Sequence, residues 1–285
     1  MNLTKFFFTI IIVSFSGLVS GQSFNIMTYN IRYDNPHDGE NQWTNRKEFL
    51  CDQIAGTKPD ILGIQEGLHH QVMYLDSVFI DYTYVGIGRD DGKKKGEYSA
   101  IFYNHKKFEV LESSTFWLSS TPNIVSVGWD ASMERICTYG LFRNKNTGQK
   151  IWVFNTHFDH IGNEARSQSA RLIWQKINEL NKGKLPVILM GDFNLKPISE
   201  PILYIASTLQ DSKTISLSIA EGPVGTFNGF RISEPILDRI DYVFVSKNNI
   251  QVNKYAVLSD IRNLRYPSDH LPVLVELTCI PSKNK

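Results

Sequence analysis

Short apolar runs, most of them closed by a polar residue, recur along the 285-residue chain. They are rich in β-branched and aromatic residues and bounded by Gly, Pro, Asn or Asp, which is the pattern of β-strands. They predict strands at 24–29, 61–64, 99–103, 109–118, 137–142, 151–155, 187–190, 242–245, 252–258 and 272–277. Apolar residues at helical spacing predict helices at 45–57, 69–79 and 164–180, and a fourth from about 199 to 209. This mixture favours an α+β fold, with two sheets packed face to face and helices outside.

Polar residues follow or precede many of these strands. The run "PVILMGDFNLKP" shows the pattern, because the buried strand ends in Asp192 and Asn194. Such residues are ordinary turn formers, but strand ends also hold catalytic groups in rigid positions. The other polar sets are Asn30 after 24–29, Glu66 after 61–64, His157, Asp159 and His160 after 151–155, Asp241 before 242–245, and Asp269 and His270 before 272–277. Six such sets at strand edges favour one shared site over six independent turns.

Each residue also has a structural interpretation. Glu66 fits an exposed turn, His157 fits a core histidine, and "SDH" at residues 268–270 fits a turn cap. Asp241 fits a surface charge paired with Arg239. The joint pattern is what favours a catalytic site.

The composition is that of a folded protein with little net charge, and the first residues of the chain predict export. Apolar residues make up 42% and charged residues 21%, and neither repeats nor linkers interrupt the chain, so we expect one domain at 22–285. Residues 1–21 place Lys5 before an apolar run and small residues, which predicts a cleaved signal peptide and a periplasmic or secreted protein; a membrane anchor is the alternative. Cleavage removes one base and no acid, so the formal charge of +1 falls to zero. A neutral protein has no general attraction for long nucleic acid, and any phosphate must be held locally.

The three cysteines are too far apart in sequence for a zinc motif. They are Cys51, Cys137 and Cys279. An exported protein could oxidise one pair, but we expect buried free thiols, because no disulfide framework is evident.

The polar residue types narrow the chemistry. The acids are hard oxygen ligands without soft partners, which favours Mg²⁺ or Mn²⁺. Histidine exchanges protons near neutral pH, and amides such as those of Asn30 and Asn194 can donate to a phosphoryl oxygen. Together these groups suit hydrolysis of a phosphoester by water.

The motifs that carry these residues occur in a fixed order. They are "TYNIR", "QEG", "ERICTYGLF", "NTHFDH", "GDFN", "RIDYVFVS" and "SDHLPV". The ordered set, over residues 24–278, resembles the deoxyribonuclease I-like endonuclease/exonuclease/phosphatase superfamily. "TYNIRYDNPHDGENQW" and "NTHFDHIGNEAR" are similar to exported bacterial members near its nocturnin-like branch. The resemblance implies a four-layered α/β/β/α sandwich with two mostly antiparallel sheets.

The resemblance also implies a role for each matched residue. The metal would be held by Glu66, Asn30 and Asp269; the catalytic residues would be His270, Asp241, Asp192, Asn194 and His157; and Arg135, Asn194 and Asn30 would bind the substrate. Asp241 would orient His270, Asp192 would position or deprotonate the water, and Glu97 would orient His157. Arg135 also fits a structural ion pair with Glu134.

The sequence leaves the substrate open. We expect a monomeric nuclease or phosphodiesterase, without a membrane anchor after cleavage, whose partner is a phosphoester substrate, nucleic acid included. A phosphatase of a small organic or lipid headgroup phosphate and a non-catalytic binding protein are the alternatives. Trp43 and Phe227 fit either core packing or stacking on a substrate, and residues 91–97, "DGKKKGE", fit either a solvated loop or a phosphate contact.

Overall fold

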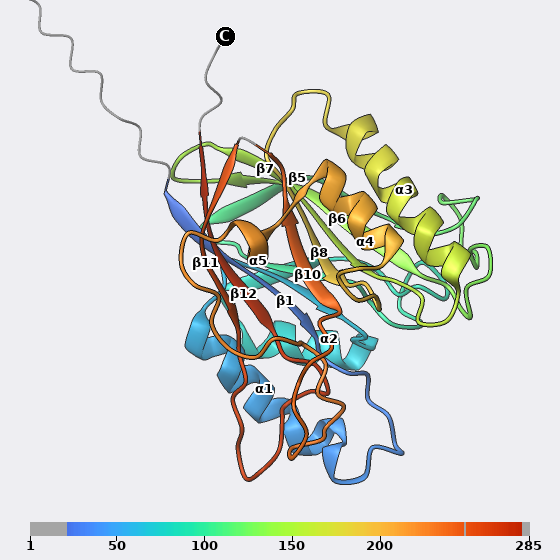
Figure 1. The fold of residues 1–285 in the computed structure, drawn as a ribbon, viewed down its shortest axis with the longest axis vertical. Helices are drawn as coiled ribbons and strands as arrows, with labels where there is room; N and C mark the ends of the chain where they lie inside the picture. The colour runs from blue at the N-terminus through green and yellow to red at the C-terminus, as the bar shows by residue number, and fades with distance from the viewer. Residues whose placement is uncertain (1–21, 248, 281–285) are drawn as a thin grey trace, which may run out of the picture.

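Two six-stranded sheets pack face to face in the computed structural model, which describes residues 22–247 and 249–280 (Figure 1). One sheet has the order β11-β12-β1-β2-β4-β3 and the other the order β5-β6-β7-β8-β10-β9. The strands of the first sheet are β1 (Ser23–Asn30), β2 (Ile61–Gln65), β3 (Tyr82–Val85), β4 (Ile101–Asn104), β11 (Ile250–Val257) and β12 (Val273–Cys279). Those of the second are β5 (Phe108–Trp117), β6 (Ile136–Asn144), β7 (Lys150–His157), β8 (Val187–Asp192), β9 (Gln210–Asp211) and β10 (Asp241–Val245).

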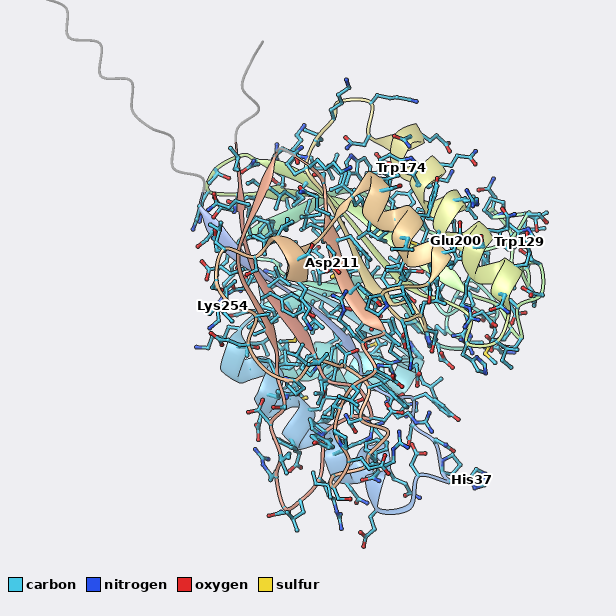
Figure 2. The ribbon with its side chains drawn as sticks, in the orientation of Figure 1. His37, Trp129, Trp174, Glu200, Asp211 and Lys254 are labelled. Atoms are coloured by element: carbon cyan, nitrogen blue, oxygen red, sulfur yellow. The ribbon has the colours of Figure 1, made fainter. Side chains whose placement is uncertain are left out.

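Helices cover the outer face of each sheet (Figure 1). They are α1 (Trp43–Thr57) and α2 (His69–Val78) on the first sheet, and α3 (Asn163–Leu180) and α4 (Glu200–Thr208) on the second; a 3-10 turn η1 (Gly39–Asn41) and a short α5 (Ser212–Ile215) complete the set. One apolar cluster fills the space between the sheets, and one lies under each helical layer. Side chains occupy the space between the ribbons (Figure 2). The expected four-layered α+β sandwich is therefore confirmed.

Helix α3 shows how the sequence forms these layers. Its apolar residues recur at helical spacing, so Ala165, Ile173 and Ile177 are buried against the sheet. The backbone N–H groups at its start lack partners within the helix. Asp130, from a distant loop, accepts hydrogen bonds from Ala165 N at 2.6 Å and from Glu164 N at 3.2 Å. A side chain remote in sequence thus caps the helix.

The predicted elements agree with the observed ones to within one or two residues at most ends. All ten predicted strands and all four helices are present. The short β3, β9 and α5 were not predicted. The thiols of Cys51, Cys137 and Cys279 are buried and free, as expected. The predicted signal peptide at 1–21 lies outside the described residues. Among the described residues, none of the helices has the length and hydrophobicity required to span a bilayer.

Strand order brings the polar strand ends to one edge of the sandwich. Strands β1 and β2 are parallel neighbours, and so are β7 and β8, so the carboxyl ends of each pair lie side by side. Beneath them, Gln65 Nε2 donates to Asn155 Oδ1 at 2.7 Å, which links the two sheets. Asn155 Nδ2 donates in turn to the carbonyls of Ile64 and Ala100. This buried polar bridge fixes the two sheets relative to each other directly below the site.

Candidate active site

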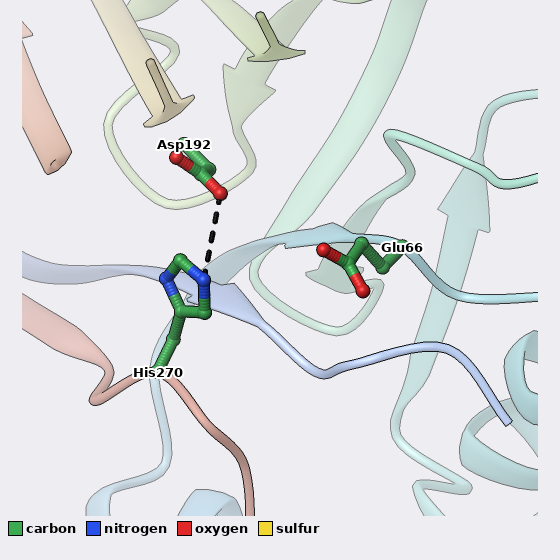
Figure 3. Close-up of side chains that lie close together, drawn as sticks. All are labelled: Glu66, Asp192 and His270. Carbon is green, nitrogen blue, oxygen red and sulfur yellow. Dashed lines mark ion pairs between the residues drawn. The ribbon is translucent and has the colours of Figure 1, made fainter. Parts of the chain in front are cut away.

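A histidine between two carboxylates forms the centre of the site. His270 precedes β12, and its Nδ1 lies 2.9 Å from Asp241 Oδ2. Its Nε2 faces Asp192 Oδ2 at 3.6 Å (Figure 3). The two acids are opposite each other on antiparallel β10 and β8. Thr226 Oγ1 donates to the same Asp241 oxygen at 2.5 Å, which fixes the carboxylate that orients the imidazole.

Burial and charge determine the protonation of these groups. Burial alone would lower the pKa of His270, but the charges of Asp241 and Asp192 raise it well above its usual value. Burial, together with the charge of Asp241, raises the pKa of Asp192 to about 7. His270 is therefore a cation at neutral pH, and Asp192 exchanges its proton near neutrality. The interpretation of Asp241 as a surface charge is wrong, because it is fully buried and Arg239 pairs with Asp211 instead.

Asn30 connects the two sheets' acids. At the end of β1, its Nδ2 donates to Glu66 Oε1 and to Asp192 Oδ2, each at 2.9 Å. Glu66 follows β2 directly, and its other carboxylate oxygen accepts from Tyr33 N at 3.1 Å. The backbone of Glu66 has φ of 65°. Non-glycine residues rarely adopt this conformation, and such strain is concentrated at functional sites.

Asp269, the third expected metal ligand, lines the same cavity and contacts Arg32. Its Oδ2 lies 3.7 Å from Arg32 Nη1, and it is almost fully buried. The carboxylate and imidazole atoms of Glu66, Asp192 and His270 lie within 4.8 Å of one another, and Asp269 is not among them. In this arrangement Asn30 turns its amide nitrogen toward Glu66, while its oxygen accepts from Arg32 N. The roles of Asn30 and Asp269 as metal ligands stay predictions.

The second histidine lies beside Asp192 and Asn194. His157 ends β7, with its Nε2 3.5 Å from Asp192 Oδ2 and 3.1 Å from Asn194 Nδ2. Burial and the nearby Arg135 lower the pKa of His157 well below its usual value, so the ring is neutral. Because the Asn194 amide donates to Nε2, the proton of the ring resides on Nδ1. That atom lies 3.7 Å from Glu97 Oε2, which is longer than a hydrogen bond. Glu97 is therefore next to His157, as expected, but does not form a hydrogen bond that would orient the ring.

Glu97 has a closer partner that the sequence did not reveal. Arg89 binds it through two nitrogens, at 2.8 and 2.9 Å. Even so, burial and the charge of Glu66 raise the pKa of Glu97 to about 7. Arg89 lies only eight residues before Glu97, but a lone arginine in a loop gives no signal of its role in the sequence.

Arg135 is held by the loop that follows β7. Its Nε lies 3.4 Å from Asp159 Oδ2, and its Nη2 lies 3.0 Å from His160 Nδ1. Its Nη1 is buried and has no hydrogen-bond partner in the described part of the chain. The suggested pair with Glu134 is not what holds Arg135. A buried guanidinium with one open donor is suited to bind an anion.

These side chains line one cavity of about 680 Å³. Its lining residues are Arg32, Tyr33, Glu66, Arg89, Glu97, Met133, Arg135, His157, His160, Asp192, Asn194, Phe227, Ile240, Asp269 and His270. Phe227 packs edge-on against His270, with ring centroids 5.0 Å apart, so it belongs to the site. Trp43 is buried in the core beneath α1, which settles its interpretation as core packing.

The acids of the cavity fit a divalent cation. Burial raises the pKa of Asp269, and the charge of Glu66 raises it further, although His270 opposes the change. Glu66, Glu97, Asp192 and Asp269 therefore share a confined space, in which the charge of Glu66 disfavours ionisation of Glu97 and Asp269. A hard cation with oxygen ligands would relieve this repulsion.

The chain belongs to the endonuclease/exonuclease/phosphatase family, whose model matches residues 27–270. This is a family of phosphoester hydrolases whose enzymes depend on divalent metals. A mannosyl-6-phosphatase from Bacteroides thetaiotaomicron VPI-5482 is 41% identical, with a TM-score of 0.85 over 90% of this chain and 99% of that one. A family protein from Bacteroides thetaiotaomicron is 40% identical, with a TM-score of 0.86 over 90% and 98%. Human nocturnin is 23% identical over 83% of this chain, which spans 58% of that protein.

Proposed function

We propose that this protein is an exported, metal-dependent hydrolase of a small phosphomonoester, such as a sugar phosphate. Hydrolysis is supported by one observation: the His270 imidazole is held between Asp241 and Asp192, beside Glu66. The substrate class is supported by the 41% identity to a mannosyl-6-phosphatase over nearly the whole of that chain. A cavity of 680 Å³ accommodates one small ligand.

Glu66 would hold the metal ion together with Asp269 and Asn30, whose amide oxygen would have to turn toward the ion. When bound, Mg²⁺ or Mn²⁺ would neutralise charge on the phosphoryl oxygens. The remaining chemistry belongs to the side chains. Arg135 would hold the phosphoryl oxygens, because its side chain lines the cavity and its Nη1 has no hydrogen-bond partner in the described part of the chain. Asn194 also lines the cavity, but its amide nitrogen donates to His157 Nε2 and to Phe158 O, so it would exchange one of these bonds for a phosphoryl oxygen.

Asp192 and His270 would have different roles in hydrolysis. Asp192, whose pKa is raised to about 7, would orient a water molecule and accept its proton as the oxygen attacks phosphorus. The bond to the leaving oxygen then breaks, and that oxygen takes up a proton, from the Asp192 carboxyl group or from solvent, to leave as an alcohol. The His270 cation would stabilise the charge that develops on the phosphoryl group. Asp241 would keep His270 protonated and correctly oriented.

A phosphodiesterase or nuclease is the second candidate. It is favoured by the similarity to the 3′-5′-exoribonuclease subunit Ccr4 of Mycosarcoma maydis, 22% identical over 90% of this chain and 50% of that protein. The same catalytic residues serve both reactions, so only the part of the substrate beyond the phosphate distinguishes them.

A substrate panel tests the proposal. Wild-type protein is assayed with Mg²⁺ and with Mn²⁺ on mannose 6-phosphate, inositol phosphates, bis-p-nitrophenyl phosphate, single-stranded RNA, and single- and double-stranded DNA. We expect kcat/KM to be highest for the sugar phosphate. The His270→Ala protein, prepared identically, controls for contaminating phosphatases. Preference for RNA, DNA or the diester would replace the proposal with the second candidate, and no hydrolysis of any compound would favour a binding protein.

A further inference from the structure

A loop with three adjacent lysines stands at the rim of the cavity. The loop is formed by residues 88–97. Arg89 near its start and Glu97 at its end both line the cavity, and the residues between them do not. Between them, Lys93, Lys94 and Lys95 are exposed. Lys95 is two residues from Glu97, so at most about 7 Å of chain separates their Cα atoms. Each ammonium is on a flexible four-carbon stem, so the three charges can reach a group bound at the cavity mouth.

The loop has a defined backbone. Asp91 Oδ1 accepts hydrogen bonds from Lys93 N at 2.8 Å and Lys95 N at 2.9 Å. The Tyr98 hydroxyl, almost fully buried, donates to Lys93 O at 3.0 Å. The backbone also closes on itself, from Asp90 N to Lys95 O at 3.1 Å and from Arg89 N to Glu97 O at 3.1 Å. The three lysine side chains are therefore attached to a backbone that hydrogen bonds hold in place.

The acids of the loop are engaged elsewhere. Asp91 accepts the backbone N–H groups just described, Asp90 lies 3.6 Å from Arg89 Nε, and Glu97 binds the same arginine. Within 22–247 and 249–280, no carboxylate forms an ion pair with any of the three lysine ammonium groups. In a chain whose formal charge is only +1, this places three lysine charges without an ion-pair partner among the described residues on a loop that begins and ends at the cavity. A loop needed only for solubility would not require a buried tyrosine and an aspartate to fix its backbone.

We propose that loop 88–97 binds a second phosphate ester on the same substrate molecule, in addition to the phosphate that is hydrolysed. This inference rests on the proposed function and narrows it to sugars or similar small molecules that carry two phosphates. The reacting phosphate would lie inside the cavity, whose lining includes Arg135 and Asn194. The three lysines, which are point charges without fixed geometry, bind the second one at the rim.

Titration calorimetry tests the subsite apart from turnover. The His270→Ala protein, in Mg²⁺, is titrated with mannose 6-phosphate and with mannose 1,6-bisphosphate. The same protein carrying Lys93→Ala, Lys94→Ala and Lys95→Ala is then compared with a control carrying Lys145→Ala, Lys150→Ala and Lys182→Ala. The control lysines are exposed and lie away from the cavity, two of them around the hairpin at the far end of β6 and β7, and their replacement removes the same charge.

We expect the loop variant to lose affinity for the bisphosphate on the order of tenfold, because it loses three exposed ion pairs, each of which contributes little by itself. Its affinity for the monophosphate should change less than twofold. The control should retain both affinities. About 1 M salt, where the Debye length is about 3 Å, should remove most of the bisphosphate preference in the lysine-intact protein.

If the loop variant lost the same affinity for the monophosphate as for the bisphosphate, the lysines would provide only a general attraction for anions, and the inference would be overturned. The absence of any bisphosphate preference, or an equal effect of the control lysines, would also overturn it. If sugar phosphates are not hydrolysed but the lysine-dependent preference persists, the proposed reaction is wrong and the subsite stands.

Discussion

The pair formed by Asp241 and His270 gives the sharpest test of the catalytic arrangement. Both side chains are at most 5% exposed, and a 2.9 Å hydrogen bond joins them. A hydrogen bond to a charged group contributes about 1.5–3 kcal/mol. Loss of the charge in Asp241→Asn should therefore lower kcat about 10- to 150-fold. His270→Ala removes the imidazole itself and should lower kcat about 10²- to 10⁴-fold.

The double variant distinguishes one unit from two independent residues. If Asp241 acts only through His270, adding Asp241→Asn to His270→Ala should lower kcat by less than about threefold. The assay is steady-state turnover of the four proteins, arranged as a double-mutant cycle. Asp60→Asn is the control, because Asp60 is also buried and paired, but with Lys107 at the opposite end of β2 from Glu66. Its kcat should match the wild type. Fully multiplicative losses in the cycle would refute the reasoning.

Three further outcomes follow from the structure. Glu66→Gln should weaken Mn²⁺ binding at least tenfold by calorimetry, and chelation should abolish wild-type activity until Mg²⁺ or Mn²⁺ is returned; unchanged Mn²⁺ affinity would refute the assignment. Asp159→Asn should lower the free energy of unfolding in urea by about 2–3 kcal/mol, because the buried carboxylate accepts hydrogen bonds from Ser132, Ile161 and Gly162. Burial would raise the pKa of Asp159, but these bonds lower it. The difference in the free energy of unfolding between variant and wild type should therefore be largest above about pH 4 and shrink as the pH falls further. A difference that does not change with pH would refute this cause. Mass spectrometry of the exported protein should show a chain that begins near Gln22, whereas an intact Met1 would indicate an uncleaved anchor.

Much of the fold could be predicted from the sequence because its strands are long, apolar and bounded by turn formers. The missed β3 and β9 are short, and their pairing depends on the neighbours β4 and β10 rather than on a pattern of their own. The candidate site residues could be grouped because they lie at or next to strand ends, and most of them line one cavity.

The partners of those residues could not be predicted in the same way. Asp241 was weighed as a partner of Arg239 two residues away, and Arg135 as a partner of Glu134 beside it. In the structure, Asp241 binds His270 and Arg135 binds Asp159. Proximity in sequence was therefore a poor guide to the partner of either residue. The actual partners come from loops whose meeting depends on the packing of both sheets.

The pairing of the first and last strands has a consequence for folding. Strand β12 pairs along its length with β1, from Ser23 opposite Thr278 to Thr28 opposite Val273, and His270 lies just before β12. The His270 imidazole is held beside Asp241 and Asp192 only when β12 has paired with β1 and completed the first sheet. A chain that ends before β12 should therefore be inactive, and the first appearance of activity during refolding would report that this pairing has formed.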